Sequence, residues 1–214
     1  MITVYGFRKV TPEVIGLTRD LRVLWALEEC GLAYQVHGLD DFANELRSAA
    51  YLEINPFGKV PAIDHEGLIL FESGAILTYL AEQSGRLMPT SGAERAQALQ
   101  WAFAALDTVE TPLTEIAAID LFDPDAEWAK QRRPALVTMA RDRLAVLDRV
   151  FSDKSYLCGE QFTYPDILMA TSLRQIQHTD LLEAFPNVTS YLERCDRRPA
   201  WRKCLDTYKQ RLAG

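Results

Sequence analysis

The sequence predicts an N-terminal α/β domain with a mixed four-stranded sheet, followed by an all-helical domain. Short β-branched and aromatic runs alternate with helical segments through residues 1–83. A segment rich in Gly, Ser and Pro at 84–92 reads as a linker, so the second domain is expected at 93–214. No strand pattern follows the linker, and apolar residues recur at helical spacing. This spacing predicts long helices at 93–119 and 127–151.

Strand and helix alternate in the first part of the N-terminal domain. Residues 1–6 (MITVYG) are typical of a strand, and residues 19–30, rich in Leu, Ala and Glu, of a helix that stops at Gly31. A second strand is expected at 33–38 and a weaker helix at 44–53. Strands joined through a helix are parallel with a right-handed crossover, so the first two strands should pair in parallel.

A turn and a β-hairpin follow. Residues 55–58 (NPFG) have turn composition, because Asn and Gly tolerate positive φ and Pro fixes its own. Residues 60–63 and 68–70 are expected to form the two antiparallel strands of the hairpin, which makes the sheet mixed. Pro61 has no N–H to give a sheet ladder, so it should stand at the start of its strand.

The hairpin and the helix after it offer two features suited to a small anionic peptide. A strand that starts at Pro61, with a cis Val60-Pro61 bond, leaves the backbone of Val60 free to pair with an outside peptide. Glu72 and Ser73 stand at a helix start, where unpaired N–H groups and the positive dipole end favour a carboxylate. Plain capping of that helix is the alternative interpretation of the Glu-Ser pair.

Residues 55–63 (NPFGKVPAI) and 71–82 (FESGAILTYLAE) resemble the glutathione-binding half of the cytosolic glutathione transferase family. The resemblance is specific, because a strand-breaking Pro and a Glu-Ser pair occur at the family's separation in a hairpin-helix context. It implies a thioredoxin-like N-terminal domain and glutathione as co-substrate. The glutathione-binding residues that it implies are Lys59, Val60, Pro61, Glu72 and Ser73. For Lys59, which matches a basic contact to the glycyl carboxylate, a mere surface lysine is the alternative.

Residues 161–173 (QFTYPDILMATSL) carry the strongest signal of the helical domain. Thr163 and Asp166 fit a capping box, and Pro165 lies in the first turn, where a missing N–H costs nothing. The residues that follow are apolar nearly all round, so this helix should be the buried centre of the domain. It resembles the buried helix of the same family, which extends the resemblance over residues 1–210.

The group that activates the thiol is ambiguous in the sequence. Members of the family lower the pKa of bound glutathione with a Tyr or Ser hydroxyl, or use a Cys, in the loop after the first strand. Here that loop, residues 7–18, is longer than the family usually shows and contains neither Ser nor Cys. Thr18 falls closest to the family's hydroxyl position, with a plain helix N-cap as the alternative. Tyr5 is the second candidate, with packing at the end of its strand as the alternative.

Composition and charge weigh against other classes of protein. A 48% hydrophobic and 25% charged content is ordinary for a soluble protein, and a net charge of −7 without a basic stripe counts against nucleic acid as a partner. No 18-residue apolar run and no basic-then-apolar N-terminus are present, so we expect neither a membrane span nor a signal peptide and favour a cytoplasmic location.

The cysteines and histidines predict neither a dithiol nor a metal site. The four cysteines form no CxxC pair and are expected to be buried free thiols. The three histidines lack ligand-like spacing with one another or with the cysteines, so no metal is expected. These residues are Cys30, Cys158, Cys195, Cys204, His37, His65 and His178.

We therefore interpret the sequence as that of a homodimeric glutathione transferase that activates glutathione for attack on a small hydrophobic electrophile, the detoxification chemistry that the resemblance implies. A glutathione-dependent reductase, peroxidase or isomerase using the same site is the enzymatic alternative. A noncatalytic transferase-like interaction module is the third, favoured by the unusual loop and disfavoured by the intact Lys59 and Glu72-Ser73. No residue identifies the electrophile.

Overall fold

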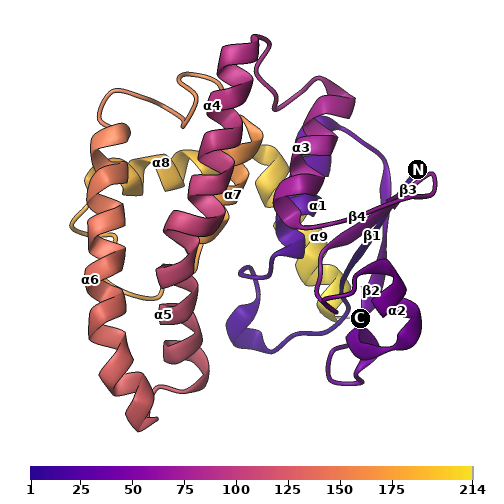
Figure 1. Ribbon diagram of the computed structural model, residues 1–214, viewed down its shortest axis with the longest axis horizontal. Coiled ribbons are helices and arrows are strands. Elements are labelled where there is room, and N and C mark those ends of the chain that lie inside the picture. The colour runs from indigo at the N-terminus through magenta and orange to yellow at the C-terminus, as the bar shows by residue number, and fades with distance from the viewer. Residues whose placement is uncertain (214) are drawn as a thin grey trace. The chain divides into compact units, whose positions relative to one another are not determined.

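The computed structural model describes residues 1–213, so Gly214, the last residue of the predicted helical domain, lies outside the described residues. The chain divides into two compact units (Figure 1). Unit 1 comprises Met1–Met88 with Arg198–Gly214, and unit 2 comprises Pro89–Arg197. Unit 1 therefore includes the C-terminal helix, which the sequence predicts in the helical domain.

Unit 1 contains the predicted mixed four-stranded sheet. Its strands are β1 (Ile2–Phe7), β2 (Tyr34–Leu39), β3 (Ala62–His65) and β4 (Leu68–Phe71), in the order β2-β1-β3-β4. β1 pairs in parallel with β2 and antiparallel with β3, and β3 pairs antiparallel with β4. The fold class predicted from the sequence is confirmed, and β3 begins one residue after Pro61, where a missing N–H costs no ladder bond.

Helices α1, α3 and α9 and the short α2 complete unit 1. Their bounds are α1 (Asp20–Cys30), α2 (Ala49–Ile54), α3 (Ser73–Ser84) and α9 (Pro199–Ala213), with short 3-10 helices η1 (Pro12–Val14) and η2 (Glu45–Arg47). α1 ends at Gly31, whose φ of 66° is the left-handed cap that the sequence predicts. The weak helix expected at 44–53 is instead split in two. Ser48, in an extended conformation, accepts the N–H of Tyr51 and starts α2 afresh.

The two faces of β1 belong to different parts of the core. Ile2 and Val4 are buried, and α1 packs on β1. The side chains that alternate with them, Tyr5 and Phe7, contact a cluster that includes Tyr51 of α2 and Val60. Tyr5 and the residues of α1 therefore lie on opposite faces of the sheet.

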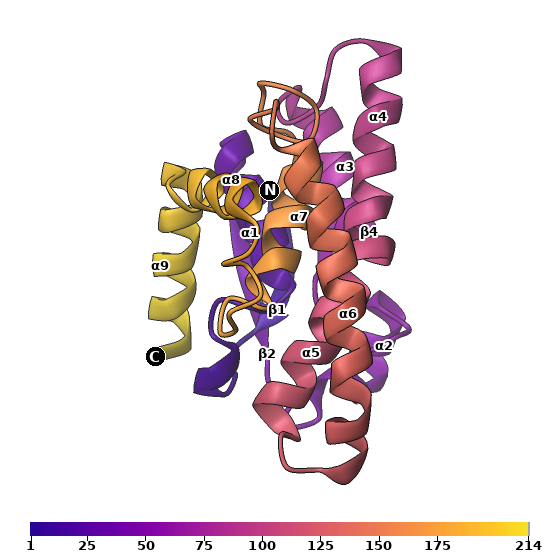
Figure 2. The same cartoon turned by 90° about the vertical axis from the view of Figure 1, so that its left-hand side faces the viewer.

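Unit 2 is all-helical within the described residues, apart from one isolated β-bridge. Its elements are α4 (Gly92–Phe103), the π-helix η3 (Ala104–Val109), α5 (Glu110–Phe122), α6 (Glu127–Val150), α7 (Tyr164–Arg174) and α8 (Pro186–Asp196). Figure 2 shows α6 running alongside α5. The long helix predicted at 93–119 is continuous but changes to π geometry in its middle, a feature that the apolar spacing does not reveal.

The capping box predicted at the start of α7 is present. The Asp166 carboxylate accepts the Thr163 N–H at 2.8 Å and the Thr163 hydroxyl at 2.9 Å. It also accepts the N–H of Leu157 at 2.9 Å and the hydroxyl of Tyr191 at 3.1 Å. Every residue from Tyr164 to Leu173 is buried, as the all-round apolar sequence predicts. A fully buried carboxylate with several donors thus ties α7 to the loop before it and to α8.

Candidate functional site

The N-terminus of α3 presents a buried hydroxyl. Ser73 is 5% exposed, and its Oγ accepts a hydrogen bond of 3.2 Å from Nη1 of Arg22, which is itself buried in α1. A serine hydroxyl has one proton and two lone pairs, so this bond leaves the Ser73 proton for a further acceptor. Sequence reasoning missed Arg22, because a basic residue inside a helical pattern gives no sign of burial.

Glu72 precedes α3 in an uncommon conformation. Its φ of 69° lies in the left-handed region, and its side chain, which is exposed, makes no cap hydrogen bond to α3. Glu72 therefore does not cap α3 through its side chain, which was the alternative for this residue. Residues held in sparsely populated backbone regions cluster at ligand sites, which makes this outlier a pointer to one.

The start of β3 lies beside that helix terminus. The antiparallel ladder pairs Ala62 with Phe71, so the start of β3 lies alongside the end of β4, which leads through Glu72 into α3. The Val60-Pro61 bond is cis, and both residues are buried. The ladder begins at Ala62, which leaves Val60 beyond the last paired residue of β3.

Lys59 is exposed, and its backbone is well held. Its carbonyl oxygen accepts the hydroxyl of Tyr51 and the side-chain amide of Asn55, each at 2.7 Å. The turn that carries the basic residue is therefore fixed, while the ammonium is free to reach an anion in solvent.

Tyr5 sits in an aromatic group on the face of the sheet that α2 covers. Its ring centre is 5.3 Å from that of His37 and 5.9 Å from that of Tyr51. Partial burial, and to a lesser degree the charge of Asp64, raises the pKa of Tyr5 above its ordinary value. This placement is the strand-end packing expected as the alternative to a catalytic role.

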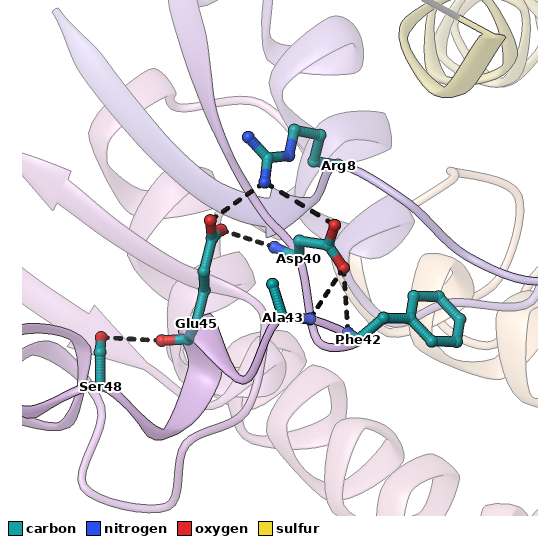
Figure 3. A network of polar contacts seen from close by, with 6 residues as sticks. All are labelled: Arg8, Asp40, Phe42, Ala43, Glu45 and Ser48. Atoms are coloured by element: carbon teal, nitrogen blue, oxygen red, sulfur yellow. Dashed lines mark hydrogen bonds and ion pairs between the residues drawn. The ribbon is translucent and has the colours of Figure 1, made fainter.

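The long loop after β1 is anchored at its start. Figure 3 shows Arg8 between two carboxylates of the segment after β2, 3.0 Å from Glu45 and 3.7 Å from Asp40. Glu45 also accepts the N–H of Asp40, and Asp40 in turn accepts the N–H groups of Phe42 and Ala43. The loop therefore leaves the sheet in a defined direction.

Thr18 lies at the other end of the loop, and its hydroxyl is engaged. Its Oγ1 is 2.7 Å from the phenolic oxygen of Tyr208, which lies in α9. The N-cap position of α1 is held by Arg19, and no side chain caps this helix. Only the Thr18 carbonyl serves α1, by accepting the N–H of Leu21 at 3.2 Å. The N-cap alternative therefore does not account for the hydroxyl.

Asp20, a residue that sequence reasoning missed, stands next to Thr18 and is completely buried. Its Oδ2 accepts the N–H of Phe7 at 3.0 Å and Nη2 of Arg211 at 3.4 Å. Burial raises the pKa of Asp20, while the Thr18 hydroxyl, Arg211 and the Phe7 N–H oppose that rise. Gly6 makes room for it, since a Cβ there would lie 2.6 Å from Oδ2.

The first turn of α1 connects these groups. Arg22, which holds Ser73, lies in the first turn of α1, and Thr18 lies just before that helix, where its carbonyl accepts the N–H of Leu21. The structure thus brings Val60, Ser73 and, through α1, Thr18 to neighbouring elements of unit 1. Tyr5 lies on the face of the sheet opposite α1, so it is separated from Arg22, although it packs against the cluster that contains Val60.

The four cysteines are free thiols, of which Cys158, on the loop between α6 and α7, is only half-buried rather than buried as expected. Within residues 1–213, no group of three or more His, Cys, Asp or Glu side chains could hold a metal ion. None of the helices in that range is both long and apolar enough to span a membrane.

Comparison with known proteins gives matches along most of the chain. The family model described as glutathione S-transferase, N-terminal domain, matches residues 13–82, and its C-terminal counterpart matches residues 110–199. Glutathione S-transferase F14 of Arabidopsis thaliana is 27% identical over 202 residues, covering 85% of this chain and 77% of the relative.

A solved structure is similar over nearly the whole length. The glutathione transferase of Burkholderia graminis, with two glutathione molecules bound per subunit, is 28% identical with a TM-score of 0.85, and the match covers 96% of this chain and 88% of that one. Elongation factor 1-gamma of Danio rerio is 30% identical over 173 residues, which are 78% of this chain but only 38% of that protein.

Proposed function

Because the chain belongs to the glutathione S-transferase family, we propose that unit 1 binds glutathione between the start of β3 and the N-terminus of α3. The observation that carries the proposal is the pairing of Ala62 with Phe71, which sets the start of β3, just after Val60 and Pro61, alongside the end of β4, which leads to a Ser73 hydroxyl held by Arg22. The Burkholderia graminis structure, which contains glutathione, supports it.

Each part of glutathione finds a matching group in this arrangement. The unpaired backbone of Val60 extends the sheet with the peptide's own backbone. The γ-glutamyl carboxylate accepts the Ser73 proton and the N–H groups at the start of α3, where the helix dipole favours negative charge. Lys59 faces the glycyl carboxylate. These contacts are the same before and during reaction, so they serve binding and not turnover.

We assign activation of the thiol to Thr18. A hydroxyl that donates to the sulfur stabilises the thiolate over the thiol and so lowers the pKa of bound glutathione. The thiol proton leaves to solvent, the sulfur lone pair forms the new S–C bond, and the electrophile releases its leaving group or opens its ring. The products are a glutathione thioether and the released leaving group or, where a ring opens, a single thioether whose freed oxygen takes a proton from solvent.

A noncatalytic transferase-like interaction module is the second candidate. It is favoured by the engagement of the Thr18 hydroxyl with Tyr208, in a loop that contains no Ser or Cys. The similarity to elongation factor 1-gamma, whose name does not describe a transferase, points the same way. Turnover with halogenated aromatics, epoxides, peroxides and mixed disulfides separates this module from a transferase and from a reductase.

Glutathione is expected to stabilise the protein, and Ser73→Ala to weaken that effect. At about 100 times its dissociation constant, glutathione should raise the free energy of unfolding by roughly 2.7 kcal/mol. Removing the Ser73 hydroxyl should raise the Michaelis constant for glutathione about tenfold with little change in kcat, because a contact common to ground and transition states is lost. Calorimetry, melting curves and steady-state kinetics measure these effects.

Ser91→Ala is the matched control for loss of a serine at a helix start. Ser91 caps α4 by accepting the N–H of Glu94 at 3.2 Å, so this variant should lose about 1 kcal/mol of stability and keep its glutathione affinity. If millimolar glutathione leaves the melting temperature of the wild type unchanged, the proposed binding site is wrong.

The protein is expected to form a two-fold dimer, as the resemblance implies. Light scattering should then give twice the chain mass of 24.2 kDa. Phe57, 66% exposed beside the hairpin, is a large apolar group that a dimer would bury, so Phe57→Asp should shift the mass towards the monomer. Phe42→Asp, at a similarly exposed ring, is the control. A wild type that scatters as one chain at micromolar concentration contradicts the prediction.

A further inference from the structure

One face of α9 contacts the segment that carries Thr18. Every third residue of α9 from Leu205 to Arg211 meets every second residue of the segment from Gly16 to Asp20. A Cβ on Gly16 would lie 3.7 Å from Leu205, Thr18 Oγ1 is 2.7 Å from Tyr208 Oη, and Asp20 Oδ2 is 3.4 Å from Arg211 Nη2. Because residues three apart share a helix face, α9 follows the loop as a continuous support.

α9 is itself fixed on α1. The indole rings of Trp25 and Trp201 lie with their centres 4.7 Å apart. Arg198 makes two hydrogen bonds, of 2.5 and 2.8 Å, to the Glu29 carboxylate of α1. A tilted aromatic pair and a bidentate ion pair hold the two helices in a single register, so the position of Tyr208 relative to α1 is set by the fold.

The direction of the Thr18–Tyr208 bond follows from burial. Tyr208 is completely buried, and within residues 1–213 Thr18 is its only hydrogen-bond partner. A phenol proton buried without an acceptor is costly, so Tyr208 donates to Thr18. Burial also raises the pKa of Tyr208, which keeps this donor protonated at neutral pH.

Thr18 then has its own proton left to give. One lone pair of its oxygen is occupied by Tyr208, so the hydroxyl hydrogen is left for a bound sulfur. A hydroxyl that accepts one hydrogen bond becomes a better donor of the next, because hydrogen bonds in a chain polarise one another.

We propose that Tyr208 is a positioning residue, which fixes and polarises the Thr18 hydroxyl so that its proton serves the glutathione thiolate. The inference rests on the proposed function and extends it to the C-terminal helix. Tyr208 acts through Thr18 and has no contact with glutathione. Its effect should therefore appear in the ionisation of the thiol and not in the binding of the peptide.

Tyr208→Phe tests this with the ring retained and the donor removed. We expect the pH–rate profile to move by about one unit towards alkali, with kcat near neutral pH about tenfold lower and the Michaelis constant for glutathione unchanged. The ultraviolet absorbance of the bound thiolate, titrated without a second substrate, should move by the same amount.

Tyr34→Phe is the matched control. Tyr34 also donates its hydroxyl to a residue of α1, at 2.9 Å to Glu28, but not to Thr18. It should lose stability like Tyr208→Phe and keep the wild-type profile. In the free protein, the urea midpoint shifts of Thr18→Val and Tyr208→Phe should be non-additive, whereas those of Thr18→Val and Tyr34→Phe should add.

The outcomes distinguish failure of the proposed function from failure of the role proposed for Tyr208. If the wild type does not bind glutathione, the proposed function fails and this inference fails with it. If glutathione binds and Ser73→Ala weakens it, but Tyr208→Phe keeps the wild-type pH profile, only the inference is overturned. Additive midpoint shifts for Thr18→Val and Tyr208→Phe would also overturn it, because they would show that the two hydroxyls are uncoupled in solution.

Discussion

Asp166→Asn is expected to lower the free energy of unfolding most at acid pH. The loss relative to the wild type should shrink by about 3 kcal/mol as the pH rises from about 4 to about 7. Burial raises the pKa of Asp166 from 3.8 to about 6, although four hydrogen bonds to the carboxylate oppose the shift. A folded-state pKa above the unfolded one stabilises the fold below pH 3.8, and that contribution is lost as the pH rises through 6. Two units correspond to about 3 kcal/mol.

The neutral amide has no such titration, so the difference between the two unfolding curves isolates Asp166. The NH₂ group of the side-chain amide would also face another donor, the N–H of Thr163 or of Leu157. This mismatch should lower the free energy of unfolding by about 1–3 kcal/mol at every pH. Urea unfolding at a series of pH values measures both parts. Ser91→Ala, an uncharged cap, should show a deficit that does not vary with pH, and parallel curves for wild type and Asp166→Asn would contradict the prediction.

The features that the sequence predicts correctly depend on neighbours in the chain. The capping box at Thr163 and Asp166 lies within four residues, and the stop at Gly31 needs only one residue that tolerates a positive φ. The mixed sheet follows because a helix separates its first two strands and a turn its last two. Local signals of this kind also sufficed to indicate the hairpin that follows Val60-Pro61 and the helix start at Ser73.

The supports of the candidate site could not be predicted, because their partners are remote in sequence. Arg22 meets Ser73 across 51 residues, and Asp20 meets Arg211 across 191. Asp20 reads as an ordinary acidic residue in a first turn, where the helix dipole favours it at the surface. Only packing shows that Gly6 leaves space for its carboxylate and that α9 covers it.

The hydroxyl of Thr18 likewise has a partner that is too remote in sequence to be predicted. The sequence offered a choice between a cap and a thiol donor, both of which are local roles. The structure shows a third partner, Tyr208, 190 residues away. The position of Thr18 relative to the start of α1 does not predict this hydrogen bond. The bond also changes which experiment separates the possible roles of Thr18.

Thr18→Val is expected to lower kcat/KM about 100-fold near neutral pH, the usual cost of removing one donor from a developing anion. The pKa of bound glutathione should rise towards about 8.5, that of a free thiol, so activity should partly return in alkali. Thr18→Ser, which keeps the hydroxyl, should restore most of the activity. A pH–rate profile for each variant measures this, and a Thr18→Val profile identical to that of the wild type would remove Thr18 from the mechanism.

Stability alone cannot separate these roles, because Thr18→Val also leaves the buried Tyr208 hydroxyl without an acceptor, at a cost of about 1–3 kcal/mol. The double variant Thr18→Val, Tyr208→Phe removes both partners, so it should recover much of that loss. It should not recover activity, since no donor remains for the sulfur. Recovered stability with absent turnover would therefore assign the catalytic loss to the missing proton of Thr18 and not to a disturbed loop.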